Sequence, residues 1–171
     1  SQDENFSVDM AWTSSEIFNR FKCLRILGFD WYTFVNKKSI EFIGKLIHLR
    51  FIRFNSCKMD KLPLQVLNLP FLQSLNLQGS VWTNPTKIPK LDIAWKAKRL
   101  RHLFFPNNGA KMVDQGKFRL CGLVQLEEII DFDTSTMEGA DLLELCNIQW
   151  FSTTIYDNES LSLILNCIEV N

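Results

Sequence analysis

The apolar side chains of Lys45–Pro63 follow neither the period of a helix nor that of a strand. They are separated by steps of three, three, two, three, two and three residues, whereas a helix repeats about every 3.6 residues and a half-buried strand about every two. The opening steps of three, three and two recur elsewhere, so the chain carries an internal repeat. The first apolar residues of the copies are Phe21, Leu46, Leu69, Ala97, Leu123 and Leu145.

Each copy of this pattern predicts one short strand and the turn that leads into it. The three-residue steps fit a turn, and the two-residue step fits a strand whose alternate side chains face the core. Since one such unit cannot bury its apolar side alone, successive units must stack, which places their strands side by side and parallel. Asp131 and Thr153 stand in the last apolar place of the final two copies, where we expect an irregular register. The predicted strands are Ile26–Phe29, Phe51–Phe54, Ser74–Leu77, His102–Phe105, Glu128–Ile130 and Trp150–Thr153.

The second apolar residues of successive copies lie 22 to 28 residues apart, which matches the period of about 20–29 residues of leucine-rich repeats. We therefore predict an α/β fold, a leucine-rich-repeat solenoid in the form of an irregular horseshoe with about six repeats. Its parallel sheet would form the concave face, and short helices or coil would form the convex face. Residues 1–20 would flank a single repeat domain of residues 21–171. The place that usually holds a ladder Asn or Cys is occupied here by Tyr32, Cys57, Ser80, Asn108, Thr134 and Tyr156.

Candidate catalytic and metal-binding residues are sparse. The five cysteines have no CxxC spacing, so reduced thiols are expected rather than a zinc site or a disulfide framework. Only two histidines are present, and no GxSxG motif occurs. Gly109–Phe118 resembles a phosphate-binding loop, but its glycines are too far apart and Phe118 stands where Ser or Thr should bind magnesium. We therefore predict that the chain is not an enzyme and holds no cofactor or metal.

Side chains that lie between the core-facing ones should cover the concave face of the sheet. Apolar and aromatic residues there have no role in the core, and in a mixture with charged residues they resemble a protein-binding patch. Two alternatives are that neighbouring loops cover some of them, or that the register differs by one residue in the last two repeats. The candidate binding residues are Phe51, Arg53, Asn55, Asn76, His102, Phe104, Ile130 and Trp150.

Charge is divided unevenly along the chain, although the net charge is zero. Residues 20–110 hold sixteen basic and four acidic residues, a balance of +12, and residues 111–171 hold three basic and eleven acidic residues, a balance of −8. An acidic partner would relieve the repulsion within the basic part. Nucleic acid is not expected as that partner, because the aromatic residues form no stacking platform. Stacking of the repeats is expected to align a basic stripe of Arg25, Arg50, Arg53 and Arg101.

Four stretches carry a resemblance to a known family: "SSEIFNRFKCLRILGFD", "IGKLIHLRFIRFNSCKMDKLP", "RLRHLFFP" and "LVQLEEIIDFDTS". They resemble plant intracellular disease-resistance proteins of the coiled-coil, nucleotide-binding, leucine-rich-repeat type, and the resemblance extends from Ser14 to Asn171. It implies a region that recognises a pathogen effector, or a host protein altered by one. It also implies that the region restrains the receptor's nucleotide-binding domain, an intramolecular partner. This chain has no phosphate loop, so it would be the sensing part without the switch.

Two other functions stay open from the sequence. One is a free-standing repeat protein that scaffolds or inhibits another protein, and the other is the substrate-recognition module of a ubiquitin ligase. The N-terminus is unlike a signal peptide and no run of about 18 apolar residues occurs, so we expect a cytoplasmic protein without a membrane span. The apolar C-terminal stretch "LSLILNCIEVN" shows no polar cap, so it should pack on a further repeat, on a tag, or on a second copy of itself through self-association.

Overall fold

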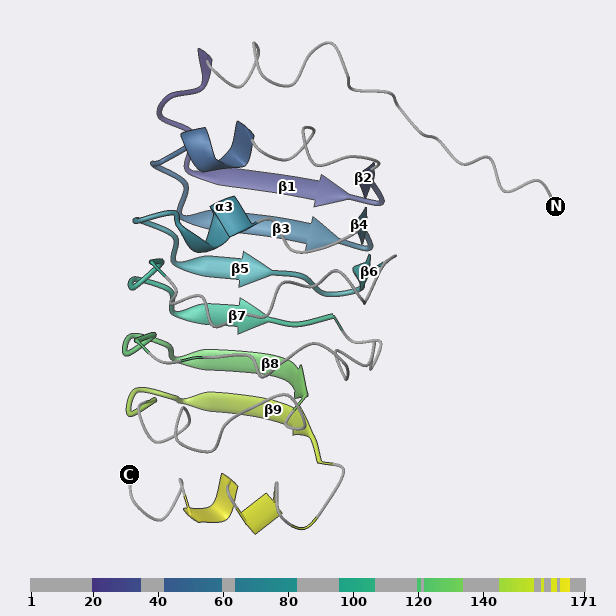
Figure 1. The fold of residues 1–171 in the computed structure, drawn as a ribbon, viewed down its shortest axis with the longest axis vertical. Helices are drawn as coiled ribbons and strands as arrows, with labels where there is room; N and C mark the ends of the chain where they lie inside the picture. The colour runs from purple at the N-terminus through teal and green to yellow at the C-terminus, as the bar shows by residue number, and fades with distance from the viewer. Residues whose placement is uncertain are drawn as a thin grey trace, which may run out of the picture.

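The six predicted strands form one parallel sheet (Figure 1). The computed structural model describes residues 20–34, 42–59, 64–82, 96–106, 120, 122–133, 145–155, 158, 161–162 and 164–166. In it the strands lie in the order β1-β3-β5-β7-β8-β9, and every neighbouring pair is parallel. The predicted leucine-rich-repeat solenoid is therefore confirmed. The strands are β1 (Ile26–Asp30), β3 (Phe51–Asn55), β5 (Ser74–Asn76), β7 (His102–Phe104), β8 (Glu128–Asp133) and β9 (Trp150–Thr154).

A tight turn precedes each strand and explains the three-residue steps of the sequence. In the second repeat, the Leu49 N–H donates to the Leu46 carbonyl at 3.0 Å and closes this turn. The chain then enters the sheet through a fork in which the N–H groups of Arg50 and Phe51 share the carbonyl of Arg25. Both arrangements recur in the later repeats, so the turn sets the register with which each strand joins the sheet.

Alternate strand residues build a continuous core beneath the sheet. In β3, Ile52 and Phe54 are fully buried, while Arg53 between them is exposed. Burial of each such side chain contributes about 1.5–3 kcal/mol to folding. The core is closed only by stacking, and Leu27 in the first strand is accordingly a little less buried. The strand residues of the core are Leu27, Ile52, Phe54, Leu75, Leu103, Ile129 and Phe132.

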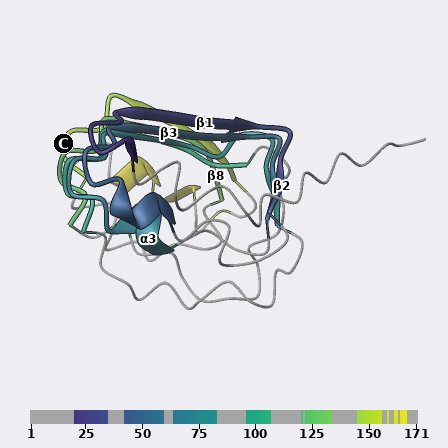
Figure 2. The same cartoon turned by 90° about the horizontal axis from the view of Figure 1, so that it is seen from above.

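Short helical segments cover the core on the side opposite the sheet, as expected for the convex face (Figure 2). They are the 3₁₀ helix η2 (Phe42–Lys45) and the helix α3 (Leu64–Leu67). The two segments pack closely, because a Cβ placed on Gly44 would lie 2.9 Å from the Cβ of Gln65. Leu145–Ile148 form the tight turn that precedes β9.

A second, three-stranded parallel sheet was not predicted. It consists of β2 (Thr33–Phe34), β4 (Lys58–Met59) and β6 (Val81–Trp82) in the order β2-β4-β6. It stands at the carboxyl ends of β1, β3 and β5 and forms the corner that Figure 2 shows at β2. The repeat pattern predicted no strand within residues 79–87, and β6 lies among them.

The irregular register expected in the last two repeats is present, but its cause differs from the prediction. Asp131 does not occupy the last core place of β8, because the pairing of β8 with β9 shifts between Ile129 and Phe132. Asp131 has a left-handed backbone with φ of 59°, and Phe132 is buried in the core instead. A bulge costs less free energy than burying a carboxylate does. Phe132 therefore occupies the core position in place of Asp131.

The ladder position binds backbone groups as the pattern predicts. Buried Cys57 directs its Sγ to the Phe29 carbonyl at 3.4 Å, and buried Ser80 donates its hydroxyl to the Phe54 carbonyl at 2.6 Å. Tyr32 lies partly buried at the equivalent place, and its carbonyl accepts the N–H of Lys58. The other three predicted ladder residues, Asn108, Thr134 and Tyr156, lie outside the described residues.

Candidate protein-interaction surface

The eight candidate binding residues all lie on the open face of the main sheet, the face opposite η2 and α3. Each alternates with a core residue of its strand, and none is fully buried. Arg53 is exposed and Trp150 is 62% exposed, whereas the other six are half-buried. The predicted register holds as far as Ile130 and changes only at the following residue.

The strand register arranges seven of these residues in two rows across the sheet, and Asn55 lies outside both rows. Arg53 pairs with Asn76, Asn76 with Phe104, and Phe104 with Ile130. Neighbouring strands lie about 4.8 Å apart, so this row is a continuous band of side chains. The second row runs through Phe51, Ser74, His102, Glu128 and Trp150.

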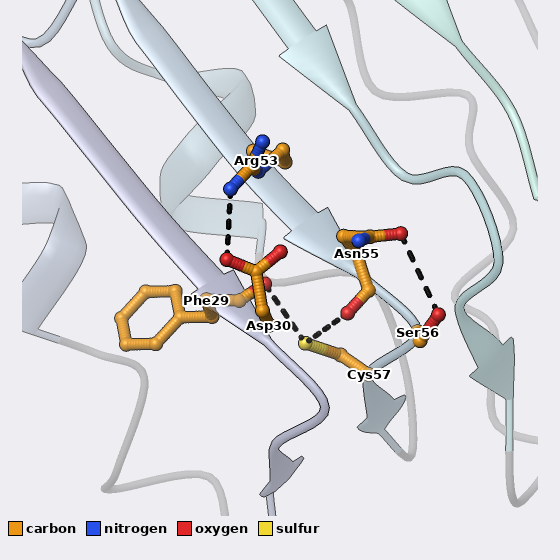
Figure 3. Close-up of polar contacts among 6 residues, drawn as sticks. All are labelled: Phe29, Asp30, Arg53, Asn55, Ser56 and Cys57. Carbon is orange, nitrogen blue, oxygen red and sulfur yellow. Dashed lines mark hydrogen bonds and ion pairs between the residues drawn. The ribbon is translucent and has the colours of Figure 1, made fainter.

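Polar contacts between strands orient several side chains of this face. The guanidinium of Arg53 lies over Gly28 and donates to the Asp30 carboxylate at 2.8 Å (Figure 3). His102 Nδ1 lies 3.1 Å from a carboxylate oxygen of Glu128 in the neighbouring strand. Both pairs are partly solvated, so each contributes little to stability and mainly sets side-chain orientation.

Side-chain amides occupy the end of the face beside the second sheet. Asn55 accepts a hydrogen bond from the Ser56 hydroxyl at 3.5 Å, as Figure 3 shows. Asn76 accepts the backbone N–H of Gln78 at 2.9 Å through its side-chain oxygen. Such amides offer both donors and acceptors to a partner.

Apolar side chains interrupt the polar ones on this face. Phe51, Phe104 and Ile130 are half-buried and belong to none of the core positions. Among the candidates with apolar side chains, Trp150 is the most exposed. Aromatic residues of this kind, next to Arg and amide groups, have the composition of the central part of protein interfaces.

In the structure, the predicted basic stripe is interrupted and partly paired with acids. Arg25 and Arg50 lie in neighbouring repeats, but Gln73 separates Arg50 from Arg101. Arg101 binds Glu127 at 2.7 Å, and Arg53 is paired with an acid as well. Within the stripe, Arg25 and Arg50 are therefore the two arginines that no described carboxylate pairs with.

Sequence reasoning did not include two exposed aromatic or aliphatic residues in the candidate set. Ile26 is 68% exposed at the start of β1, and Trp31 is 79% exposed just beyond its end. Ile26 could have been found from its pairing with Phe51 in the same row. Trp31 has a left-handed backbone with φ of 59°, a conformation that the local sequence does not reveal.

Chemistry other than binding has little support among the residues that the structure describes. They contain no group of three or more His, Cys, Asp or Glu side chains that could hold a metal ion. The same residues include no helix of the length and apolar character needed to cross a membrane. His48, Cys23 and Cys146 are exposed at turns, and none of them lies on the open face.

Comparison with known proteins supports the assignment made from the repeats. A family model described as a leucine-rich repeat region matches residues 7–168. Disease resistance protein RPP8 of Arabidopsis thaliana is 31% identical over 150 residues, which cover 88% of this chain and 16% of RPP8. Disease resistance protein RPH8A of the same plant is 31% identical over 160 residues, which cover 92% of this chain and 17% of RPH8A. The chain thus spans about a sixth of the length of these relatives. No solved structure gives a significant match.

Proposed function

Because the chain belongs to the leucine-rich repeat region family and is similar over most of its length to plant disease resistance proteins, we propose that it is the protein-recognition domain of a plant immune receptor. Its ligand is a pathogen effector, or a host protein altered by one, and it acts by binding and not by catalysis. Recognition of this kind takes place in the cytoplasm.

The observation that supports a protein ligand is the make-up of the open face. Phe104, Ile130 and Trp150 lie on three neighbouring strands and keep part of their surface in water. Removing that surface from water is favourable only when a complementary partner covers it. Arg53 and His102, held by their acids, supply oriented polar contacts beside the apolar ones.

Truncation of the exposed aromatic residues tests this proposal. In the full-length receptor, we expect Phe104→Ala with Trp150→Ala to weaken ligand binding about 30-fold or more, as loss of an interface hot spot does. The measurement is the cell-death response of leaf tissue to the pathogen strain that triggers the receptor, at equal receptor abundance. Val81→Ala is the matched control, because Val81 is exposed on β6, in the small second sheet. An unchanged response in the double variant, or an equal loss with Val81→Ala, would contradict the proposal.

We also propose that the basic stripe contacts the receptor's nucleotide-binding domain and restrains it. Since Arg53 and Arg101 are already paired with acids, Arg25 and Arg50 carry this contact. The prediction is that Arg25→Gln with Arg50→Gln weakens binding to that domain in trans more than Arg53→Gln with Arg101→Gln. Equal effects of the two pairs would show that the division within the stripe is wrong.

A further inference from the structure

The turns that precede the strands line up into a ridge along the long axis of the molecule. Each turn is closed by the same three-residue backbone hydrogen bond, so its two tip residues occupy equivalent places in all six repeats. In Figure 1 the tips follow the left edge of the sheet, and in Figure 2 they lie over one another at the end opposite β2. The tip residues, which we call the turn ridge, are Lys22–Cys23, Ile47–His48, Pro70–Phe71, Lys98–Arg99, Val124–Gln125 and Cys146–Asn147.

The charge of the turn ridge has one sign. All of its residues are exposed, and none is Asp or Glu. Lys22, Lys98 and Arg99 form no ion pair with another described residue. Lys22 lies in the first turn and Lys98 and Arg99 lie in the fourth, so about three strand spacings of 4.8 Å separate them. Their fields therefore add to those of the neighbouring cations at each of these two places, within the screening length of about 8 Å at physiological salt. Further exposed cations flank the tips: Arg25, Lys45, Arg50 and Lys96.

Apolar side chains occupy turns between and after these cations along the same line. Ile47 is 49% exposed and Val124 is 48% exposed, each at the foremost position of its turn. Their places in the pattern leave them outside the core, and no described strand or helix covers them. A ridge that combines exposed aliphatic groups with cations matches the surface of proteins that lie on membranes, where the apolar groups enter the headgroup region.

The arrangement around Phe71 argues against a nucleic-acid partner. The His48 ring stacks on it with a centroid distance of 6.1 Å and an interplanar angle of 13°. The guanidinium of Arg99, which comes from the following repeat, lies 5.1 Å from the centroid of the ring. Since both neighbours already cover the ring, it is not available as a platform for bases.

We propose that the turn ridge binds the surface of an anionic phospholipid bilayer. The ridge is a projecting edge, which suits a flat surface, and its charge is complementary to that of phosphatidylserine headgroups. Such binding is peripheral and leaves the open face of the sheet free for a protein ligand. The proposal does not rest on the protein ligand proposed above, because the turn ridge and the open face share no residue, although Arg25 and Arg50 beside the ridge belong to the basic stripe.

Vesicle co-sedimentation of the full chain tests this site. We expect binding to phosphatidylcholine vesicles that contain phosphatidylserine, no binding to phosphatidylcholine alone, and release at high salt. Each cation near such a surface contributes about fivefold to the affinity, so Lys22→Gln with Lys98→Gln and Arg99→Gln should weaken binding about 100-fold. Ile47→Ser with Val124→Ser should weaken it at unchanged charge.

A matched control separates the ridge from general charge attraction. Lys58 is exposed on β4, at the opposite end of the strands, and Lys58→Gln removes the same charge as Lys98→Gln. The single Lys98 variant should lose about fivefold in affinity, and the Lys58 variant should keep the affinity of the unaltered chain. Equal losses in the two variants would overturn the proposal. Binding of polyglutamate or single-stranded RNA without binding of the anionic vesicles would overturn it as well.

Discussion

At the scale of single residues, the corner between the two sheets is formed by three residues of different types that share one backbone conformation. Trp31, Ser56 and Gly79 hold the same place in successive repeats, and their φ angles are 59°, 53° and 68°. A left-handed backbone costs a residue with a Cβ about 1–2 kcal/mol. Hydrogen bonds between repeats offset part of this cost, as when the Ser56 N–H donates to the Gln78 carbonyl at 3.2 Å. No residue type marks the corner, so the sequence could not predict it.

Replacement of Gly79 by Ala should destabilise the chain more than the same change at Gly122. Both glycines have a positive φ, so both substitutions strain the backbone. A Cβ at Gly79 would also lie 2.9 Å from the Ser56 hydroxyl oxygen, whereas one at Gly122 would meet no atom within 4 Å. We expect losses of about 1–2 kcal/mol at Gly122 and more at Gly79, measured by urea unfolding. Equal losses would show that the corner relaxes around an added methyl group.

Cys57 should react last among the described thiols. Burial raises the pKa of the Cys57 thiol above its ordinary value of 9.0, so little thiolate forms near neutral pH. Alkylation of the folded chain should modify exposed Cys23 and Cys146 first. Unfolding without a reductant should then allow all five cysteines to be labelled, as counted by mass spectrometry. Three labels or one would indicate disulfides.

The same pKa shift has a consequence for stability. The folded chain holds the Cys57 proton more tightly than the unfolded chain does, since its pKa is raised on folding. This contribution to stability is therefore fully present below about pH 9 and is lost as the pH rises through the folded value. Cys57→Ser should lack this alkaline loss, which comparison of unfolding midpoints at neutral and alkaline pH would measure.

The alternation of residues along each strand also predicted which side chains lie on the open face, but it did not predict which of them contact one another. That Arg53 and Trp150 avoid the core follows from strand alternation alone. That Arg53 meets Asp30, and Arg101 meets Glu127, depends on residues more than twenty positions apart in the sequence. Such contacts follow from how the repeats stack, so a single sequence shows them only after the register is known.

At the scale of elements, the sheet that could be predicted is the one with a local period. Six strands follow a turn of fixed length, and each turn leaves its mark as two apolar residues three positions apart. The strands of the second sheet are two residues long and carry no period of their own. Their pairing arises from the stacking of neighbouring corners, which explains why the repeat pattern did not predict β6.

The bulge in β8 leads to a prediction about deletion. Removal of Asp131 joins Ile130 to Phe132 and restores the steps of three, three and two that the regular repeats have. The deletion also removes a residue with a φ of 59°. We therefore expect the deleted chain to fold and to unfold cooperatively, with a melting temperature close to that of the parent chain by circular dichroism.

Deletion of Arg53 is the matched control for the bulge. β3 has no bulge, so the same change there would shift Phe54 from the core to the open face. Loss of a buried Phe side chain costs about 3–5 kcal/mol, and every later side chain of the strand would change face as well. A chain that tolerates both deletions, or neither, would show that the bulge in β8 is not an inserted residue in an otherwise regular repeat.

At the scale of the whole molecule, the solenoid separates three surfaces that the sequence mixes. Core residues, open-face residues and turn-tip residues alternate within a few positions, yet each set collects on its own side of the stack. The open face carries paired charges and half-buried apolar groups, whereas the turn ridge carries cations without carboxylates. This separation would leave one side of the chain for the proposed protein ligand and another for the proposed lipid surface.

The end of the solenoid that follows β9 should mediate self-association. Among its described residues, Leu161 is 38% exposed and Leu165 is 50% exposed, and Ile155 before them is 44% exposed. Exposed apolar side chains of this kind are a suitable contact for the same residues of a second copy. Sedimentation velocity should show reversible association that increases with concentration, and Leu161→Glu with Leu165→Glu should abolish it, because a dimer would bury two carboxylates from each copy without partners. Val81→Glu adds one carboxylate on β6 at a side chain as exposed as Leu161, and it should leave association unchanged. A chain that stays monomeric at every concentration, or that loses association equally with Val81→Glu, would mean that this end is not the contact.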